Sequence, residues 1–285
     1  MNVYINGKIV AKEDVRISAF DHGFLYGVGL FETFRVYDGH PFLLDDHLDR
    51  LNHGLDIVNI KWSYSKQEII EAIRMVLAAN QLTNAYVRLN VSAGNGEIGL
   101  QTEPYLNPNT IMFAKPLPHA GEMIEKNATI LHLHRNSPEG FERLKSHHYL
   151  NNLLAKRELG SEDSQEGIFL TKEGFIAEGI VSNVFWISDG QLLTPTVETG
   201  ILNGITRQFI LSLATSLGLA VSEGYYTLVD VAKAKEVFFT NSIQEIVPVV
   251  IFNRKILPGK SGEWVTVFHK KYREYSPYLW SRKDL

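Results

Sequence analysis

The chain has 285 residues, a formal net charge of −4 and no cysteine. Hydrophobic residues make up 45% of it and charged residues 21%, which is typical of a globular protein and excludes disordered or fibrous classes. The lack of cysteine excludes disulfides, thiolate catalysis and cysteine metal sites, and no block of like charge predicts a nucleic-acid partner. No stretch has the length of a membrane span. We therefore expect a cytoplasmic protein whose partners are small molecules or a second copy of itself.

The first part of the chain predicts a sheet with helices. Asn6-Gly7 between two short apolar runs indicates a hairpin. Leu48, Leu51 and Leu55 recur at helical spacing, and Ser65 with Glu68 forms a capping box that opens a further helix. Predicted strands lie at residues 31–37, 86–93 and 110–114, and predicted helices at residues 45–57 and 65–81.

Pro116, Pro118 and Gly121 indicate a linker, so we expect two domains, residues 1–118 and 122–285. Strands and helices are mixed without strict alternation, which favours two α+β domains over a doubly wound sheet. The chain from Tyr272 onward gives no clear prediction. In the second domain, predicted strands lie at residues 128–133, 167–170, 184–187 and 237–240, with 167–170 and 184–187 paired, and predicted helices lie at residues 146–159 and 204–219 and after Thr227.

Two sequence patterns resemble functional sites, but we do not interpret them as such. Residues 94–99 match the dinucleotide-binding fingerprint, but no helix start follows them, so we expect a glycine-rich loop. The histidines lack the helical spacing of a zinc pair, so we expect no metal site.

A lysine and a glutamate remain as candidate chemical groups. Lys145 stands between an apolar residue and a predicted helix start, where it is either a partly desolvated amine able to form an imine or a solvated lysine at a helix end. Spacing alone favours the solvated lysine. Glu178 enters an apolar strand and either faces a pyridinium nitrogen or pairs with a nearby arginine.

A third candidate is the segment of residues 200–207, which leads into the helix predicted at residues 204–219. Its glycines and hydroxyl suit an anion at a helix N-terminus, and the alternative is ordinary capping by Asn203 or Thr206. Ser242 and Arg50 are further donors for the same anion.

In this order, these segments resemble the class IV pyridoxal-phosphate transaminases over nearly the whole chain. The matching segments are residues 21–27, 31–35 and 47–51, Lys145, Glu178-Gly179, residues 182–185 and 200–207, and Ser242 with residues 245–248. The resemblance implies an α+β, two-domain, fold type IV enzyme similar to D-amino-acid transaminase, working as a homodimer with pyridoxal 5'-phosphate. It also implies that Lys145 holds the cofactor as a Schiff base, that Glu178 binds its ring nitrogen and that Leu202 packs on the ring. The implied phosphate ligands are Arg50, Ile205, Thr206 and Ser242.

Within the family, residues 21–27 and 150–158 look most like bacterial aminodeoxychorismate lyases. That resemblance implies conversion of 4-amino-4-deoxychorismate to p-aminobenzoate, a folate precursor, and pyruvate. The alternative is a D-amino-acid or branched-chain transaminase. Arg88 is our candidate for the residue that binds a substrate carboxylate; the alternative is an arginine with a structural ion pair on a strand. Thr33 and Tyr26 are expected to line the substrate pocket. His148 stands where relatives often have asparagine.

Overall fold

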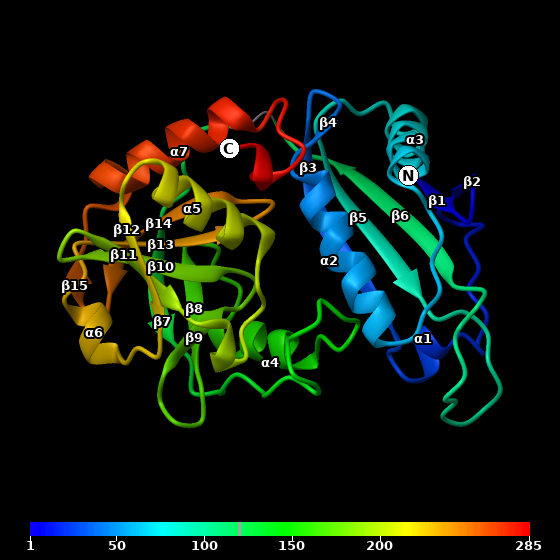
Figure 1. Ribbon diagram of the computed structural model, residues 1–285, viewed down its shortest axis with the longest axis horizontal. Coiled ribbons are helices and arrows are strands. Elements are labelled where there is room, and N and C mark those ends of the chain that lie inside the picture. Colours follow the sequence, from blue (N-terminus) through cyan, green and yellow to red (C-terminus); the bar gives the residue numbers. More distant parts are fainter. Residues whose placement is uncertain (119–120) are drawn as a thin grey trace. The chain divides into compact units, whose positions relative to one another are not determined.

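The computed structural model describes residues 1–118 and 121–285. It divides into two compact units (Figure 1). The first is Met1–Gly121 with Leu144–His148 and Ser276–Asp284, and the second is Glu122–Arg143 with Tyr149–Tyr275 and Leu285. Residues 119 and 120, at the centre of the expected linker, lie outside the described residues. The expected division into domains 1–118 and 122–285 remains a prediction, and two later segments of the chain group with the first unit.

The first unit contains an antiparallel sheet with the strand order β2-β1-β6-β5-β3-β4. Its core consists of apolar side chains of the sheet and of the two longer helices, among them Phe34, Leu51 and Ile73. The strands are β1 (Asn2–Ile5), β2 (Lys8–Ala11), β3 (Gly29–Tyr37), β4 (His40–Pro41), β5 (Ala85–Ser92) and β6 (Asn109–Pro116), and the helices are α1 (His22–Leu25), α2 (Leu44–Ile57) and α3 (Lys66–Ala79).

Local chemistry explains why the predictions in this unit are confirmed. Asn6 and Gly7 both have positive φ angles, of 47° and 87°, as a two-residue hairpin turn requires. Ser65 accepts from the Glu68 backbone N–H and the Glu68 side chain accepts from the Ser65 backbone, which completes the predicted capping box.

The second unit contains a mixed sheet with the order β12-β11-β10-β13-β14-β7-β8-β9, and β15 pairs with β14. Its central strand β10 is buried throughout, since Trp186 belongs to one core cluster while Phe185 stacks on Phe238. The strands are β7 (Lys126–Ile130), β8 (Gln165–Leu170), β9 (Ile176–Gly179), β10 (Asn183–Ser188), β11 (Gln191–Pro195), β12 (Ala220–Gly224), β13 (Glu236–Asn241), β14 (Glu245–Phe252) and β15 (Lys255–Ile256), and the helices are α4 (Leu150–Leu159), α5 (Ile205–Ser216), α6 (Leu228–Ala232) and α7 (Glu263–Tyr275).

In the second half, the bounds of one strand, one strand pairing and the start of one helix were predicted wrongly. The predicted strand at residues 128–133 runs from Lys126 to Ile130. The predicted pairing of residues 167–170 with 184–187 does not occur, because β9 lies between them in sequence and pairs with β8, while β10 pairs with β11 and β13. The helix predicted from Ser146 begins at Leu150, because the preceding residues are extended and pair with the start of β3.

The C-terminal segment, residues 276–284, caps helix α2 through its backbone. The first N–H groups of a helix lack intrahelical partners, and the N-cap residue Leu43 supplies no side-chain bond. The carbonyl of Leu279 accepts from Leu43 N–H and that of Trp280 accepts from Asp45 N–H, both at 3.1 Å. Neither this role nor helix α7 could be predicted from the sequence, because both depend on contacts with distant residues.

Within residues 1–118 and 121–285, no helix combines the length and apolar character needed to cross a membrane. The same residues contain no cluster of acidic and histidine side chains arranged to hold a metal ion.

The buried carboxylate of Asp46 should anchor the C-terminal segment. It accepts from the Arg282 backbone N–H at 2.8 Å and lies 3.2 Å from Arg282 Nε. We expect Asp46→Ala to lower the free energy of unfolding by about 1–3 kcal/mol in urea titrations, because buried donors lose their acceptor. Asp49→Ala is the control: its pair with Lys283 is exposed, so the loss should stay below about 1 kcal/mol. Equal losses would contradict the anchoring role.

Candidate active site

In the first unit, Arg50 is held by a buried carboxylate on β3. Glu32 accepts from Arg50 Nε at 2.7 Å and from Nη2 at 2.6 Å, and His47 Nδ1 lies 2.6 Å from Glu32 Oε2. Burial acts to raise the pKa of Glu32, but Arg50 and His47 outweigh it and lower the pKa to about 2. The predicted phosphate ligand Arg50 therefore has a fixed direction. Glu32 and His47 are functional candidates that sequence reasoning missed, although His47 precedes Arg50 by three residues, the spacing of one helix face.

Lys145 lies on extended backbone beside the start of β3. Its carbonyl accepts from Phe31 N–H at 2.9 Å, and His147 N–H donates to the Gly29 carbonyl at 3.0 Å. The Lys145 Nζ atom lies 4.6 Å from the centroid of the Phe31 ring. Lys145 therefore does not lie at a helix end, as the interpretation as a solvated lysine required. Its role as an imine-forming amine remains a prediction.

Arg88 lies at the same aromatic ring. Its Cζ atom is 3.6 Å from the Phe31 ring centroid, and in the β3–β5 ladder Arg88 is paired with Thr33. The first unit thus brings Lys145, Arg88 and Thr33 to one part of β3 and its neighbours. The Phe31 ring is the group that both Lys145 and Arg88 contact. Nothing in the sequence around Phe31 predicted this role.

Tyr26 and the glycine-rich loop form a second cluster in this unit. Gly99 N–H donates to Tyr26 Oη at 2.8 Å, and His22 Nε2 lies 2.8 Å from the Glu97 carbonyl oxygen. Residues 94–99 form a loop with no helix after it, which confirms that the dinucleotide fingerprint is out of context. The unusual His148 lies with its Nε2 3.1 Å from the Tyr26 carbonyl oxygen, so it belongs to this cluster.

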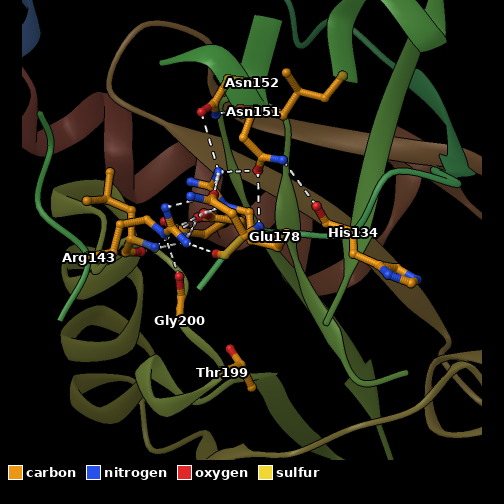
Figure 2. Close-up of polar contacts among 12 residues, drawn as sticks. His134, Arg143, Asn151, Asn152, Glu178, Thr199 and Gly200 are labelled. Atoms are coloured by element: carbon orange, nitrogen blue, oxygen red, sulfur yellow. Dashed lines mark hydrogen bonds and ion pairs between the residues drawn. The ribbon is translucent and has the colours of Figure 1, made fainter. Parts of the chain in front are cut away.

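In the second unit, Glu178 is buried on β9 and surrounded by donors (Figure 2). Arg135 Nε donates to its Oε1 at 2.8 Å, while Leu202 N–H and Asn183 Nδ2 donate to Oε2 at 3.1 and 3.3 Å. The expected arginine pairing is confirmed. It does not exclude a role toward a cofactor, because these bonds also fix where the carboxylate points. Asn183, which also donates to the Leu202 carbonyl at 2.8 Å, is a further residue that sequence reasoning missed.

A ring of amides holds the two arginines beside Glu178 (Figure 2). Arg135 Nη1 donates to Asn151 Oδ1 at 2.7 Å, and Asn136 Oδ1 accepts from both Arg135 and Arg143 at 3.2 and 3.3 Å. Arg143 Nε lies 4.0 Å from Glu178 and donates to the Gly200 carbonyl. Burial, and then the nearby Arg135, lower the pKa of Arg143 to about 10.

Helix α5 begins with a set of donors suited to an anion. Its N-cap is Gly204, which has no side chain to satisfy the first N–H groups of the helix. The Thr206 and Ser242 hydroxyl oxygens lie 3.3 Å apart, and Asn203 Oδ1 accepts from Arg207. The N-cap residue is thus Gly204, and neither Asn203 nor Thr206 occupies that position. Glycine is required at position 204, because a Cβ atom there would stand 2.1 Å from Asn183 Oδ1.

The predicted site residues thus form two groups, each described within its own unit. The first unit holds Arg50, Lys145, Arg88, Thr33 and Tyr26, and the second holds Glu178, Leu202, Ile205, Thr206 and Ser242.

Two histidines in the first unit should make stability depend on pH. Burial, followed by the Arg88 charge, lowers the pKa of His147 to about 4, and burial lowers the pKa of His47. Between pH 6.5 and 4 the unfolded chain takes up a proton that folded His147 does not, so the free energy of unfolding falls as the pH falls. At pH 5 the loss due to His147 should reach up to about 2 kcal/mol. Urea titrations at pH 7.5 and 5.0 should show a smaller loss for His147→Asn; an unchanged loss would refute this assignment.

The chain is similar to known proteins along most of its length. Residues 29–252 match the family model described as amino-transferase class IV. The aminodeoxychorismate lyase of Bacillus subtilis is 43% identical over 95% of this chain and 94% of its own. The putative branched-chain-amino-acid aminotransferase of Methanocaldococcus jannaschii is 36% identical, covering 96% of each chain.

The fold agrees with these matches. The crystal structure of the Escherichia coli branched-chain amino acid aminotransferase superposes with a TM-score of 0.85 at 30% identity, covering 98% of this chain and 95% of that one. The expected α+β, fold type IV architecture is therefore confirmed. From the family match and these relatives, we conclude that the chain is an enzyme of the class IV aminotransferase family.

Proposed function

We propose that this enzyme is an aminodeoxychorismate lyase that converts 4-amino-4-deoxychorismate to p-aminobenzoate and pyruvate for folate biosynthesis. The observation that carries the proposal is the 43% identity, over nearly all of both chains, to the Bacillus subtilis lyase. The local geometry supports it, since an amine and a guanidinium lie at one aromatic ring in the first unit. A lyase acting on an amino acid of this kind requires both a basic amine and a carboxylate ligand.

The donors and acceptors suit pyridoxal 5'-phosphate. Lys145 would attach it through Nζ, the fixed carboxylate of Glu178 would face its ring nitrogen, and Leu202 would pack on its ring. The N–H groups at Ile205 and Thr206, the Ser242 hydroxyl and the Arg50 guanidinium would bind its phosphate. When bound, this cofactor supplies an electron sink beside the reacting carbon.

The chain's own residues would then bind the substrate and move its protons. Arg88 binds a carboxylate, and Thr33 and Tyr26 border the substrate. Neutral Lys145 takes the proton from the ring carbon that bears the amine. The bond from the ring to the enolpyruvyl oxygen then breaks and the ring becomes aromatic. A proton returned to the departing enolpyruvate, for which Lys145 is the candidate donor, gives pyruvate.

The second candidate function is transamination of D-amino or branched-chain amino acids. It is favoured by the 36% identity to the Methanocaldococcus jannaschii protein and by the likeness to the Escherichia coli structure. In that reaction Lys145 moves a proton between substrate and cofactor, and no fragment is eliminated.

We also propose a cytoplasmic homodimer. Phe24, Ile98 and Leu100 expose most of their side chains on the first unit. Large apolar side chains that are this exposed suit a contact with another protein, and a second copy of the chain is the partner that the resemblance implies.

The lyase and the transaminase are distinguished by one assay. The protein is mixed with pyridoxal phosphate and 4-amino-4-deoxychorismate without a keto acid, and both products are followed by chromatography. We expect equimolar p-aminobenzoate and pyruvate over many turnovers. A yield that stops at or below one equivalent, with continuous turnover of D-alanine or L-leucine plus a keto acid, would instead establish the transaminase.

Removing the Lys145 amine should abolish either reaction. We expect Lys145→Ala to lower turnover by at least about a thousandfold, because attachment and proton transfer are both lost. Lys156→Ala serves as control: Lys156 is an exposed lysine of helix α4, outside the proposed site, and its removal should leave wild-type turnover. Wild-type activity in Lys145→Ala would refute the assigned base.

A further inference from the structure

Strand β5 carries a buried amide whose donor atom is unused. Asn90 is 8% exposed, and its Oδ1 accepts from Arg88 Nε at 3.0 Å. Because Nε can only donate, this bond fixes the amide with its oxygen toward Arg88 and its NH2 group turned away. Among the residues that the structure describes, Asn90 Nδ2 has no hydrogen-bond partner. Buried polar groups are nearly always paired, so this donor calls for an acceptor from outside the chain.

The neighbouring Arg88 is held in one orientation. Its guanidinium lies 3.6 Å above the Phe31 ring, and its bond to Asn90 uses Nε alone. The two terminal nitrogens carry four of the five N–H donors of an arginine and are not engaged by Asn90. Because the Phe31 ring and Asn90 already fix this guanidinium, it loses little conformational entropy when its terminal N–H groups bind a planar anion.

The permanent charge of Arg88 at this ring favours an anion. Lys145 Nζ lies 4.6 Å from the Phe31 centroid, so the Lys145 amine and the Arg88 guanidinium share this ring. His147 is stacked on the same ring, with centroids 6.3 Å apart, and its low pKa of about 4 keeps it neutral at physiological pH. Its Nε2 is a further buried atom without a partner among the described residues.

We propose that Asn90 and Arg88 together form a carboxylate subsite, with the Phe31 ring as its platform. One carboxylate oxygen would accept from the Arg88 fork and the other from Asn90 Nδ2. The occupant is the carboxylate of the amine substrate, so this inference rests on the proposed function. It adds Asn90 as a residue that selects a carboxylate over a neutral group of the same shape.

Asn90→Asp tests the subsite directly. Aspartate has the same shape and still accepts from Arg88 Nε, but it replaces the NH2 donor with a negatively charged acceptor. The probes are 4-aminobenzoate and its neutral isostere 4-aminobenzamide, and their Kd values are measured by calorimetry on the holoenzyme. We expect the wild-type protein to prefer the acid. Asn90→Asp should reduce that preference about ten- to hundredfold, as expected for the loss of a hydrogen bond to a charged group.

Two further variants complete the design. Asn90→Ala removes the donor without adding charge and should reduce the preference about tenfold, so the test survives if the aspartate variant does not fold. Asn52→Ala, at an exposed position of helix α2, should keep the wild-type preference. In steady-state kinetics, Asn90→Ala should raise KM about tenfold and change kcat little, whereas a merely structural role would lower the melting temperature and leave the acid preference intact.

The outcomes separate the subsite from the proposed reaction. Unchanged acid preference in folded Asn90→Asp or Asn90→Ala, with normal lyase turnover by the wild-type protein, would overturn the subsite alone. A lost preference in these variants supports the subsite even if the wild-type protein fails the lyase assay, in which case only the proposed function falls.

Discussion

The alternation of side chains along β3 is the constraint on which the candidate site residues of the first unit depend. Successive residues of a strand point to opposite faces, so Glu32 faces helix α2 and holds Arg50, while Phe31 and Thr33 face the other way. The same strand pairs at its start with the segment that carries Lys145. A shift of one residue in register would exchange the two faces and separate the lysine from its aromatic neighbour.

In the second unit, a buried carboxylate has the corresponding role. A buried charge is stable only when it is paired, and Glu178 is paired through Arg135 and the Leu202 N–H. Asn183 connects this carboxylate to Leu202, and Gly204 leaves room for Asn183 at the start of α5. The Glu178 carboxylate and the start of α5 are therefore packed against the same Asn183 side chain.

Much of the fold could be predicted where local chemistry decides it. The Asn6-Gly7 turn, the capping box at Ser65 and the apolar spacing of α2 are local signals, and all three are confirmed. The helix start was misplaced at Ser146 because its backbone bonds are made with β3, more than a hundred residues earlier. For the same reason, the cap that Leu279 supplies to α2 could not be read from either segment.

For the site, the sequence by itself determined which chemical groups are available: a lysine, a buried acid, a glycine-led helix start and several arginines, in an order that resembles one enzyme family. The tertiary structure decided what each group touches. No individual role could be assigned to Arg135, Asn183 or Asn90 from the sequence, because the role of an amide or arginine depends on the distant residues that fix its orientation and remove it from water. Residue types are encoded locally, whereas hydrogen-bond partners and burial are set only when strands far apart in the chain are brought into register.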